Sequence, residues 1–274
     1  MPNGSPWPTV GIVTPSLNKV EYIEDALASV ANQGYPRLEH VVVDGGSTDG
    51  TLEVLGRQGG RVRWSSESDA GQADAVNKGL ARATGEILGW LNADDFYEPD
   101  AVHAAVSFLA GHPEVDVVYG DCIFLYQDAE PEESRLVRAR PFDLGVLLDI
   151  GCFIHQPATF IRRAALVGTT LDEGLRFAMD YDLWIRLARA SRKFAYLPRT
   201  LATFRITASS KSGARLDEFW REVRGVSRKH GGRFFSPMLL RHLKEGLAGR
   251  WPGAYASAKR VFTSLVRRPR PGAG

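Results

Sequence analysis

The stretch "WLNADDFYEPD", residues 90–100, closes an apolar segment on two adjacent aspartates, Asp94 and Asp95. The residues just before them, 87–91 (ILGWL), have the apolar character of a buried strand. Neighbouring carboxylates repel each other unless a positive group or water lies between them. A hard divalent cation prefers oxygen ligands and would relieve this repulsion. The stretch therefore predicts a buried strand that ends at a cation-binding edge.

The composition is that of an ordinary globular protein, with 274 residues, 44% hydrophobic and 24% charged, enough for one large domain or one domain with an extension. The net charge of +2 gives no indication of nucleic-acid binding. The sequence holds no uncharged apolar run of about 18 residues, and "MPNGSPWPTV" at its start lacks the features of a secretory signal. Cys122 and Cys152 have no metal-type spacing, so we expect free thiols in a reducing compartment. A cytoplasmic protein is expected.

Apolar and amphipathic segments alternate over the first 125 residues. Asn18 and Glu21 form a capping-box-like pair that predicts the start of the first helix. The alternating order predicts an α/β fold with a Rossmann-like, mostly parallel sheet flanked by helices, whose ligands bind at the carboxyl ends of the strands. The expected strands are residues 9–14, the segment up to Val43, and residues 61–64, 86–92 and 115–121.

Several polar residues fall at or just beyond these expected strand ends. Each alone could be a helix cap or a turn residue, but their convergence on one edge of the sheet indicates a binding site. No GxGxxG or GxxxxGK[ST] phosphate loop is present. A cation held by one or two carboxylates takes its other ligands from water and substrate phosphates, so a metal-bound nucleoside diphosphate is expected. The converging residues are Asn18, Asp44, Asp69, Asp94 and Asp95.

Three segments resemble the family 2 glycosyltransferases with the GT-A fold: residues 10–51, residues 68–95 ("SDAGQADAVNKGLARATGEILGWLNADD") and residues 179–188 ("MDYDLWIRLA"). The first reads "VGIVTPSLNKVEYIEDALASVANQGYPRLEHVVVDGGSTDGT". The resemblance runs from about Thr9 to Ser212, roughly three quarters of the chain. It implies an inverting transferase that uses a UDP-, GDP- or dTDP-linked sugar with Mn²⁺ or Mg²⁺.

The resemblance also implies roles for individual residues on the donor side. The strand-end aspartates correspond to a DXD-type motif, in which Asp95 would ligate the metal and Asp94 would contact the ribose. The remaining nucleotide-sugar contacts implied are Thr14, Pro15, Asn18, Asp44 and Asp69.

The sequence departs from the family pattern at three positions, Gly45, Asn92 and Met179, where many relatives carry an acidic residue. The first of these departures concerns recognition of the uracil edge, the second the metal site, and the third the acidic pair before the acceptor helix. The QxxRW signature of processive synthases is missing, which favours transfer of a single sugar.

The acceptor side should supply a carboxylate that deprotonates the acceptor hydroxyl. Asp180 in "FAMDYDLWIRLARAS" begins an amphipathic helix, whose N-terminus should stabilise its ionised form. Capping of this helix by Asp180 and Asp182 is the alternative, but Asp180 corresponds to the family's second acidic position and is predicted to be the base. Further candidates on the acceptor or diphosphate side are His155, Asp182, Arg205 and Lys211.

These features predict a glycosyltransferase domain over residues 1–212, with a nucleotide-sugar-binding half (9–125) and an acceptor-binding half (126–212). Residues 213–274 form a basic, aromatic, helical C-terminal extension. Its composition suits peripheral contact with an anionic membrane, where a lipid-linked acceptor could wait. A solvated helix packed on the domain is the alternative.

The function predicted is transfer of one sugar from a nucleotide-diphosphate sugar to a hydroxyl of a glycan or lipid-linked saccharide. The alternative is a non-catalytic binding or scaffold subunit of the same fold, to which the three departures would point. Another metal-nucleotide enzyme on a similar sheet would leave "MDYDLW", residues 179–184, without a role.

Overall fold

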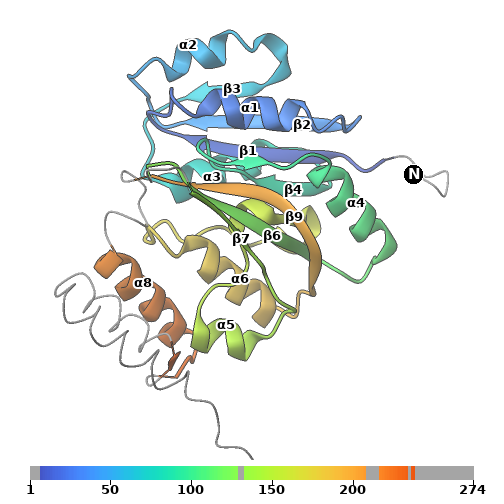
Figure 1. The fold of residues 1–274 in the computed structure, drawn as a ribbon, viewed down its shortest axis with the longest axis vertical. Helices are drawn as coiled ribbons and strands as arrows, with labels where there is room; N and C mark the ends of the chain where they lie inside the picture. The colour runs from blue at the N-terminus through green and yellow to red at the C-terminus, as the bar shows by residue number, and fades with distance from the viewer. Residues whose placement is uncertain (1–6, 129–132, 208–215, 234–235, 238–274) are drawn as a thin grey trace, which may run out of the picture.

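The computed structural model describes residues 7–128, 133–207, 216–233 and 236–237. Lys211 and most of the predicted extension, including residues 238–274, lie outside these ranges, so their predicted roles remain predictions. A nine-stranded sheet forms the centre of the molecule, in the order β3-β2-β1-β4-β8-β6-β9-β5, with β7 paired to β6 (Figure 1).

The first four strands form the parallel part of the sheet. Strand β1 pairs with β2 and β4, and β2 pairs with β3, all in parallel. In this register Ser16 lies opposite Asp44, which lies opposite Ser66, so the carboxyl ends meet at one edge. The strands are β1 (Val10–Ser16), β2 (Leu38–Asp44), β3 (Arg63–Ser66) and β4 (Ile87–Trp90).

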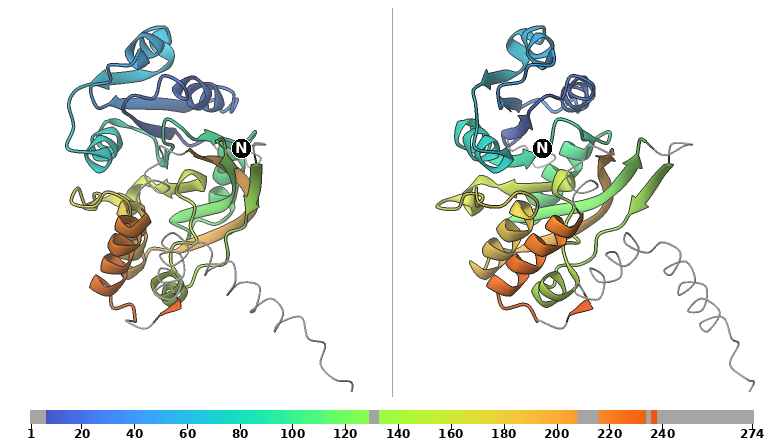
Figure 2. Two further views of the ribbon diagram at one scale, coloured as in Figure 1. Left: turned by 60° about the vertical axis from the view of Figure 1, so that its left-hand side comes forward. Right: turned by 90° about the vertical axis from the view of Figure 1, so that its left-hand side faces the viewer.

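The rest of the sheet is mixed. Strand β8 runs antiparallel to β4 and β6, β7 runs antiparallel to β6, β5 runs antiparallel to β9, and β6 and β9 pair in parallel. The long strands curl, as the two turned views show (Figure 2). The α/β class and the GT-A type sheet are confirmed, with the predicted parallel character concentrated in β1 to β4. The strands are β5 (Phe96–Tyr97), β6 (Val117–Tyr126), β7 (Glu133–Val137), β8 (Thr159–Arg162) and β9 (Phe194–Ile206).

Helices cover both faces of the sheet. Helices α1 and α4 share one buried apolar cluster with the strands, while α3, α5, α6 and α8 contribute to a second cluster. The helices are α1 (Ile23–Ala31), α2 (Thr51–Gly56), α3 (Gln72–Arg82), α4 (Ala101–Gly111), α5 (Leu144–Ile150), α6 (Met179–Arg189) and α8 (Leu216–Lys229), with 3-10 turns η1 (Gly59–Arg61), η2 (Gln156–Ala158) and η3 (Arg163–Leu166). Within these residues no helix is long and apolar enough to cross a bilayer.

Close packing fixes helix α3 on the sheet. A Cβ atom at Gly79 would collide with the side chain of Val13 in β1, so glycine allows the helix to approach the strand. This approach matters because α3 carries Gln72 and Asn77, which bond to the two halves of the site described below.

The predicted capping box at Asn18 is wrong. Helix α1 begins at Ile23 with Tyr22 in the cap position, and Asn18 lies upstream with a positive φ of 50°. Asparagine tolerates this left-handed conformation. Asn18 thus turns the chain at the strand edge rather than starting the helix.

Candidate active site

The loop after β2 is organised by Asp44, whose side chain is completely buried. One carboxylate oxygen accepts hydrogen bonds from the backbone N–H groups of Gly46 (3.0 Å) and Ser47 (2.8 Å) and from the hydroxyl of Ser66 (2.7 Å). The other accepts the Ser47 hydroxyl at 2.5 Å. Asp44 therefore shapes the strand-end loop, as a turn residue would.

Asn18 joins the same loop from the end of β1. Its side-chain oxygen accepts a hydrogen bond from the Thr48 N–H at 2.9 Å, and its own N–H donates to the Ser47 hydroxyl at 2.7 Å. The structure thus brings Asn18 and Asp44 together through Ser47, as the convergence of strand ends predicted.

Thr14 and Pro15 lie deeper than predicted. Both are buried within β1, and the Thr14 hydroxyl lies 2.9 Å from Nε2 of His40. Burial lowers the pKa of His40 to about 4, which keeps this internal pair neutral. The Thr14 hydroxyl is thus engaged inside the protein, and the nucleotide contacts of Thr14 and Pro15 stay predictions. The residue that the sequence did not single out is Ser16, whose buried hydroxyl has no partner among the described residues.

The side chain of Asp69 occupies the space that a side chain at position 45 would need. One carboxylate oxygen of Asp69 accepts a hydrogen bond from the Gly71 N–H at 2.9 Å. The other lies 2.5 Å from where a Cβ atom at Gly45 would stand. The absence of an acidic side chain at position 45 is therefore matched by a carboxylate that arrives from the loop before α3.

The paired aspartates after β4 have opposite environments. Asp95 is 1% exposed, and its carboxylate accepts hydrogen bonds from the Arg205 N–H (3.0 Å) and the Asn92 side chain (3.1 Å). Burial, together with the charge of Asp94, raises the pKa of Asp95 well above its ordinary value. The side chain of Asp94 is 21% exposed and pairs with Nζ of Lys19 at 2.7 Å.

These environments argue against the sequence-based roles of the two aspartates. Strand β4 ends at Trp90, so the pair lies in the following turn and not on alternating strand faces. The outward carboxylate is Asp94, whereas the predicted metal ligand, Asp95, has both oxygens engaged inside the protein.

Asn92 is the centre of the hydrogen-bond network beneath this turn. Its side-chain oxygen accepts from Gln72 (2.7 Å) and from the Trp90 indole (2.9 Å). Its amide nitrogen donates to Asp95 (3.1 Å) and to Gln156 (3.1 Å). An aspartate at this position would lose both donated bonds and add a third carboxylate. Gln156, which neighbours the predicted His155, is a site residue that the sequence did not identify.

The residues at this edge fit a divalent cation of limited protein coordination. Over the described ranges, no group of three or more His, Cys, Asp or Glu side chains could enclose a metal ion. The edge instead offers the partly exposed carboxylates of Asp69 and Asp94, of which Asp94 is paired with the ammonium of Lys19. Mg²⁺-type sites of this kind take most of their ligands from substrate phosphates and water.

Asp180 is the second residue of α6 and is partly buried. Its carboxylate accepts a hydrogen bond from the Tyr181 N–H at 2.7 Å. Burial raises the pKa of Asp180 to about 6, and the charge of Glu222 adds to the increase. The expected stabilisation of the ionised form by the helix N-terminus is therefore outweighed, which corrects the sequence-based expectation.

Glu222 in α8 holds the turn that precedes Asp180. Its carboxylate accepts hydrogen bonds from the backbone N–H groups of Arg176 (3.1 and 3.0 Å), Phe177 (2.6 Å) and Ala178 (2.7 Å). A side chain from a distant helix thus fixes the backbone of the turn that leads into α6.

Asp182 serves a different purpose from Asp180. It is completely buried and bonds to Nε of Arg186 (2.6 Å) and to His230 (2.9 Å). Burial alone would raise the pKa of Asp182, but the bonds from His230 and Arg186 hold it below its ordinary value. The predicted acceptor-side role is replaced by an ion network that joins α6 to the end of α8.

Helix α3 connects the strand edge to the helix carrying Asp180. Gln72 at its start bonds to Asn92, and Asn77 bonds to the backbone of Leu171, both donating to its carbonyl (3.1 Å) and accepting from its N–H (2.8 Å). Met179, next to Asp180, belongs to the same buried apolar cluster as Trp90. Helix α3 and this apolar cluster therefore support both the turn of Asp94 and Asp95 and the segment that leads into α6.

The remaining candidates have mixed surroundings. His155 is half-buried with its ring against Phe124, and burial lowers its pKa to about 4, so its imidazole is neutral. Arg205 is 7% exposed and donates to Asp25 at 2.7 Å, with its guanidinium 4.8 Å from the Tyr22 ring. Arg205 therefore lies beside the strand edge but is already paired with α1.

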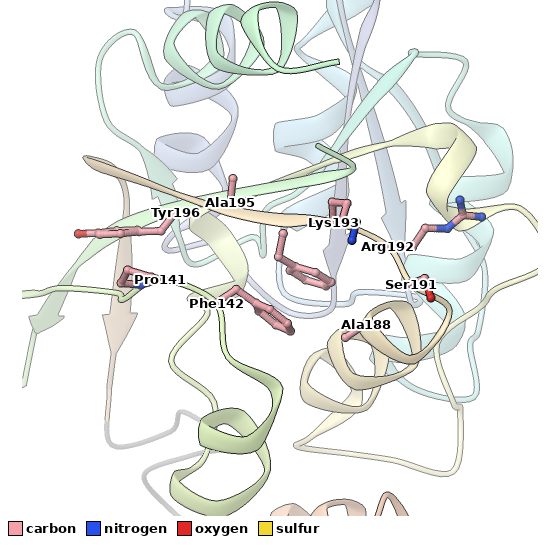
Figure 3. A pocket seen from close by; sticks show the side chains of 9 residues that line it. Pro141, Phe142, Ala188, Ser191, Arg192, Lys193, Ala195 and Tyr196 are labelled. Carbon is pink, nitrogen blue, oxygen red and sulfur yellow. The ribbon is translucent and has the colours of Figure 1, made fainter. Parts of the chain in front are cut away.

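One groove of about 630 Å³ lies away from these carboxylates (Figure 3). It is lined by Phe142 and by residues 193–196 at the beginning of β9, whereas Arg205 lies near the end of the same strand. The groove is separate from the strand edge.

The curled sheet with carboxylates at its parallel-strand edge defines a GT-A type protein, and solved structures agree. S. aureus TarS superposes with a TM-score of 0.62 at 20% identity over 88% of this chain, which spans 44% of that protein. The mannosyltransferase PcManGT from Pyrobaculum calidifontis gives a TM-score of 0.61 at 23% identity over 98% of this chain and 81% of that one. These likenesses establish the fold.

The chain belongs to glycosyl transferase family 2, because the family model matches residues 11–167. An uncharacterised glycosyltransferase of Mycobacterium tuberculosis is 41% identical over 187 residues, covering 66% of this chain and 69% of the relative. A PGL/p-HBAD biosynthesis glycosyltransferase of Mycobacterium bovis is 36% identical over 186 residues, covering 65% and 69%. The resemblance seen in the sequence is confirmed.

Proposed function

We propose that the chain transfers one sugar from a nucleotide-diphosphate sugar to an acceptor hydroxyl with inversion at the anomeric carbon. The observation that carries the proposal is the state of Asp180. This carboxylate is partly buried, forms no ion pair with a cationic side chain among the described residues and has a pKa of about 6. Such a group is ionised at neutral pH yet basic enough to accept a proton during reaction.

The donor would bind at the strand edge. Asp94 would ligate Mn²⁺ or Mg²⁺, and Asn18, Asp44 and Asp69 would shape the nucleotide side. A bound divalent cation would offset negative charge on the departing diphosphate. Solved neighbours support a nucleotide-sugar donor, since TarS binds UDP-GlcNAc and PcManGT binds GDP-Man with Mn²⁺. Their bases differ, so UDP-, GDP- and dTDP-sugars are all candidates here.

The reaction would proceed by a single displacement. The acceptor oxygen forms a bond to the anomeric carbon from the face opposite the diphosphate, the bond to the diphosphate breaks, and the hydroxyl proton passes to Asp180. His155 would line the acceptor side, and Arg205 would support the turn of Asp94 and Asp95. The acceptor class proposed is a glycan or a lipid-linked saccharide.

The proposed domain boundary moves towards the C-terminus. Helix α8 packs against α6, and Trp220, Val223 and Val226 belong to the main buried cluster. With Glu222 bonded to the turn before Asp180, residues 216–233 would form part of the acceptor-binding half and not a separate extension.

A donor screen tests the proposed function. Purified protein is incubated with UDP-, GDP- and dTDP-sugars with and without Mn²⁺, and free nucleoside diphosphate and the anomeric configuration of the product are followed by NMR. We expect slow metal-dependent hydrolysis of one donor class with inversion. Binding of nucleoside diphosphates without turnover of any donor would indicate the non-catalytic subunit instead, and retention of configuration would remove the base role of Asp180.

A further inference from the structure

Lys19 occupies a defined position beside the strand-end carboxylates. Its backbone N–H donates to the Thr51 hydroxyl at 3.0 Å, and its carbonyl accepts from the N–H groups of Tyr22 (3.0 Å) and Ile23 (2.9 Å) at the start of α1. The side chain is 27% exposed, and Nζ lies 2.7 Å from Asp94. The ammonium is therefore delivered by an ordered turn rather than by a free surface side chain.

No other cationic group is recorded against Asp94 in the described part of the chain. The backbone N–H of Arg205 donates to Asp95, but its guanidinium forms an ion pair with Asp25. In the donor-free protein, Lys19 thus supplies the positive charge that adjacent carboxylates need.

We propose that Lys19 is the resident counter-cation of Asp94 and that a divalent metal ion must displace its ammonium in order to bind. This inference rests on the proposed function, in which Asp94 is the metal ligand. An ammonium in contact with a carboxylate oxygen and a divalent cation on that same oxygen would repel each other strongly. Lys19 therefore lowers the affinity of the donor-free protein for metal.

The displacement has a consequence for the order of binding. A metal ion that has to compete with Lys19 for one carboxylate gains more from the additional oxygen ligands of a diphosphate. The cation therefore enters with the nucleotide-sugar, and the released ammonium becomes available to a negatively charged donor.

The test measures Mn²⁺ binding to donor-free protein by electron paramagnetic resonance. Lys19→Gln removes the charge and keeps a polar side chain that is one atom shorter, and we expect its Mn²⁺ affinity to be about 5- to 20-fold tighter than wild type. Lys78→Gln is the matched control, because Lys78 forms a similar partly exposed pair with Asp74 at 3.0 Å. Its Mn²⁺ affinity should equal that of wild type.

A second readout uses thermal unfolding. Without Mn²⁺, Lys19→Gln should unfold at a lower temperature than wild type, because Asp94 and Asp95 lose their counter-cation. Saturating Mn²⁺ should remove this difference in unfolding temperature. Equal or weaker Mn²⁺ affinity of Lys19→Gln, with binding still abolished by Asp94→Asn, would overturn the role of Lys19 alone. Absence of Mn²⁺ binding to every variant, with or without UDP or GDP, would overturn this inference together with the metal role of Asp94.

Discussion

The molecule holds two carboxylate pairs, Asp94 with Asp95 after β4 and Asp180 with Asp182 in α6, and each pair divides in the same way. Asp95 is 1% exposed and Asp182 is 0% exposed, and both accept hydrogen bonds from other elements of the fold. Asp94 and Asp180 are only partly buried. One member of each pair is therefore held inside the fold, while the other is more accessible to solvent.

The available members differ in their electrostatic surroundings. Asp94 faces the ammonium of Lys19, whereas Asp180 lies near the like charge of Glu222. A desolvated carboxylate near another negative charge binds protons more readily, as the raised pKa of Asp180 shows. In the proposed function, cation binding would therefore fall to the strand edge and proton transfer to the helix.

The largest effect is expected at Asp180. Asp180→Asn should reduce kcat by about 10²- to 10⁴-fold, the usual contribution of a general base, with little change in donor affinity. Burial raises the pKa of Asp180 from its ordinary value of 3.8 to about 6 in the folded protein. The folded protein therefore loses stability as the pH rises from 3.8 to about 6, because the unfolded chain releases this proton first. The variant should therefore unfold at a higher temperature than wild type at about pH 8 but not at about pH 4. A fully active Asp180→Asn variant would contradict the assignment of Asp180 as the general base.

An intermediate effect is expected at Asp94. Asp94→Asn should weaken binding of the nucleoside diphosphate by about 10- to 100-fold when Mn²⁺ is present and much less when it is absent. Calorimetric titration in the two conditions measures the difference. Equal losses with and without Mn²⁺ would show that Asp94 contacts the nucleotide directly and is not a metal ligand.

A smaller effect is expected from Glu222. In the proposed mechanism the ionised form of Asp180 is the active one, so kcat/KM should fall below about pH 6 as Asp180 takes up a proton. Glu222→Gln removes a like charge, which should lower the pKa of Asp180 and move this decline to lower pH. The pH profile of kcat/KM measures the shift. A pH profile that is unchanged or shifted to higher pH would show that the charge of Glu222 does not raise the pKa of the base.

The sequence was sufficient for the class of fold and for the edge where the site forms. Apolar strands that each end in a polar residue placed Asn18, Asp44, Asp69 and the Asp94/Asp95 pair at one edge, and the structure joins Asn18 to Asp44 through Ser47. Strand periodicity carries this information because the carboxyl ends of parallel strands meet by geometry.

The sequence could not assign roles within each pair. Burial of Asp95 depends on Arg205, which is 110 residues away, and burial of Asp182 depends on His230, which is 48 residues away. The pKa of Asp180 likewise depends on Glu222 in a helix that the sequence assigned to a separate extension. Such long-range contacts leave no local pattern, so a rule based on the helix N-terminus predicted the wrong direction for this pKa.

The division within the pairs is tested most directly by measuring thermal unfolding and sugar transfer together for four variants: Asp94→Asn, Asp95→Asn, Asp180→Asn and Asp182→Asn. We predict that Asp94→Asn and Asp180→Asn lose transfer while remaining as stable as wild type at neutral pH, or more so. Asp182→Asn should lose about 1–3 kcal/mol of stability, because its partners His230 and Arg186 are left poorly satisfied. Asp95→Asn should retain both stability and transfer, because burial raises the pKa of Asp95 as it does that of Asp180. Loss of transfer by Asp95→Asn or Asp182→Asn at full stability, with Asp94→Asn or Asp180→Asn remaining active, would contradict the account.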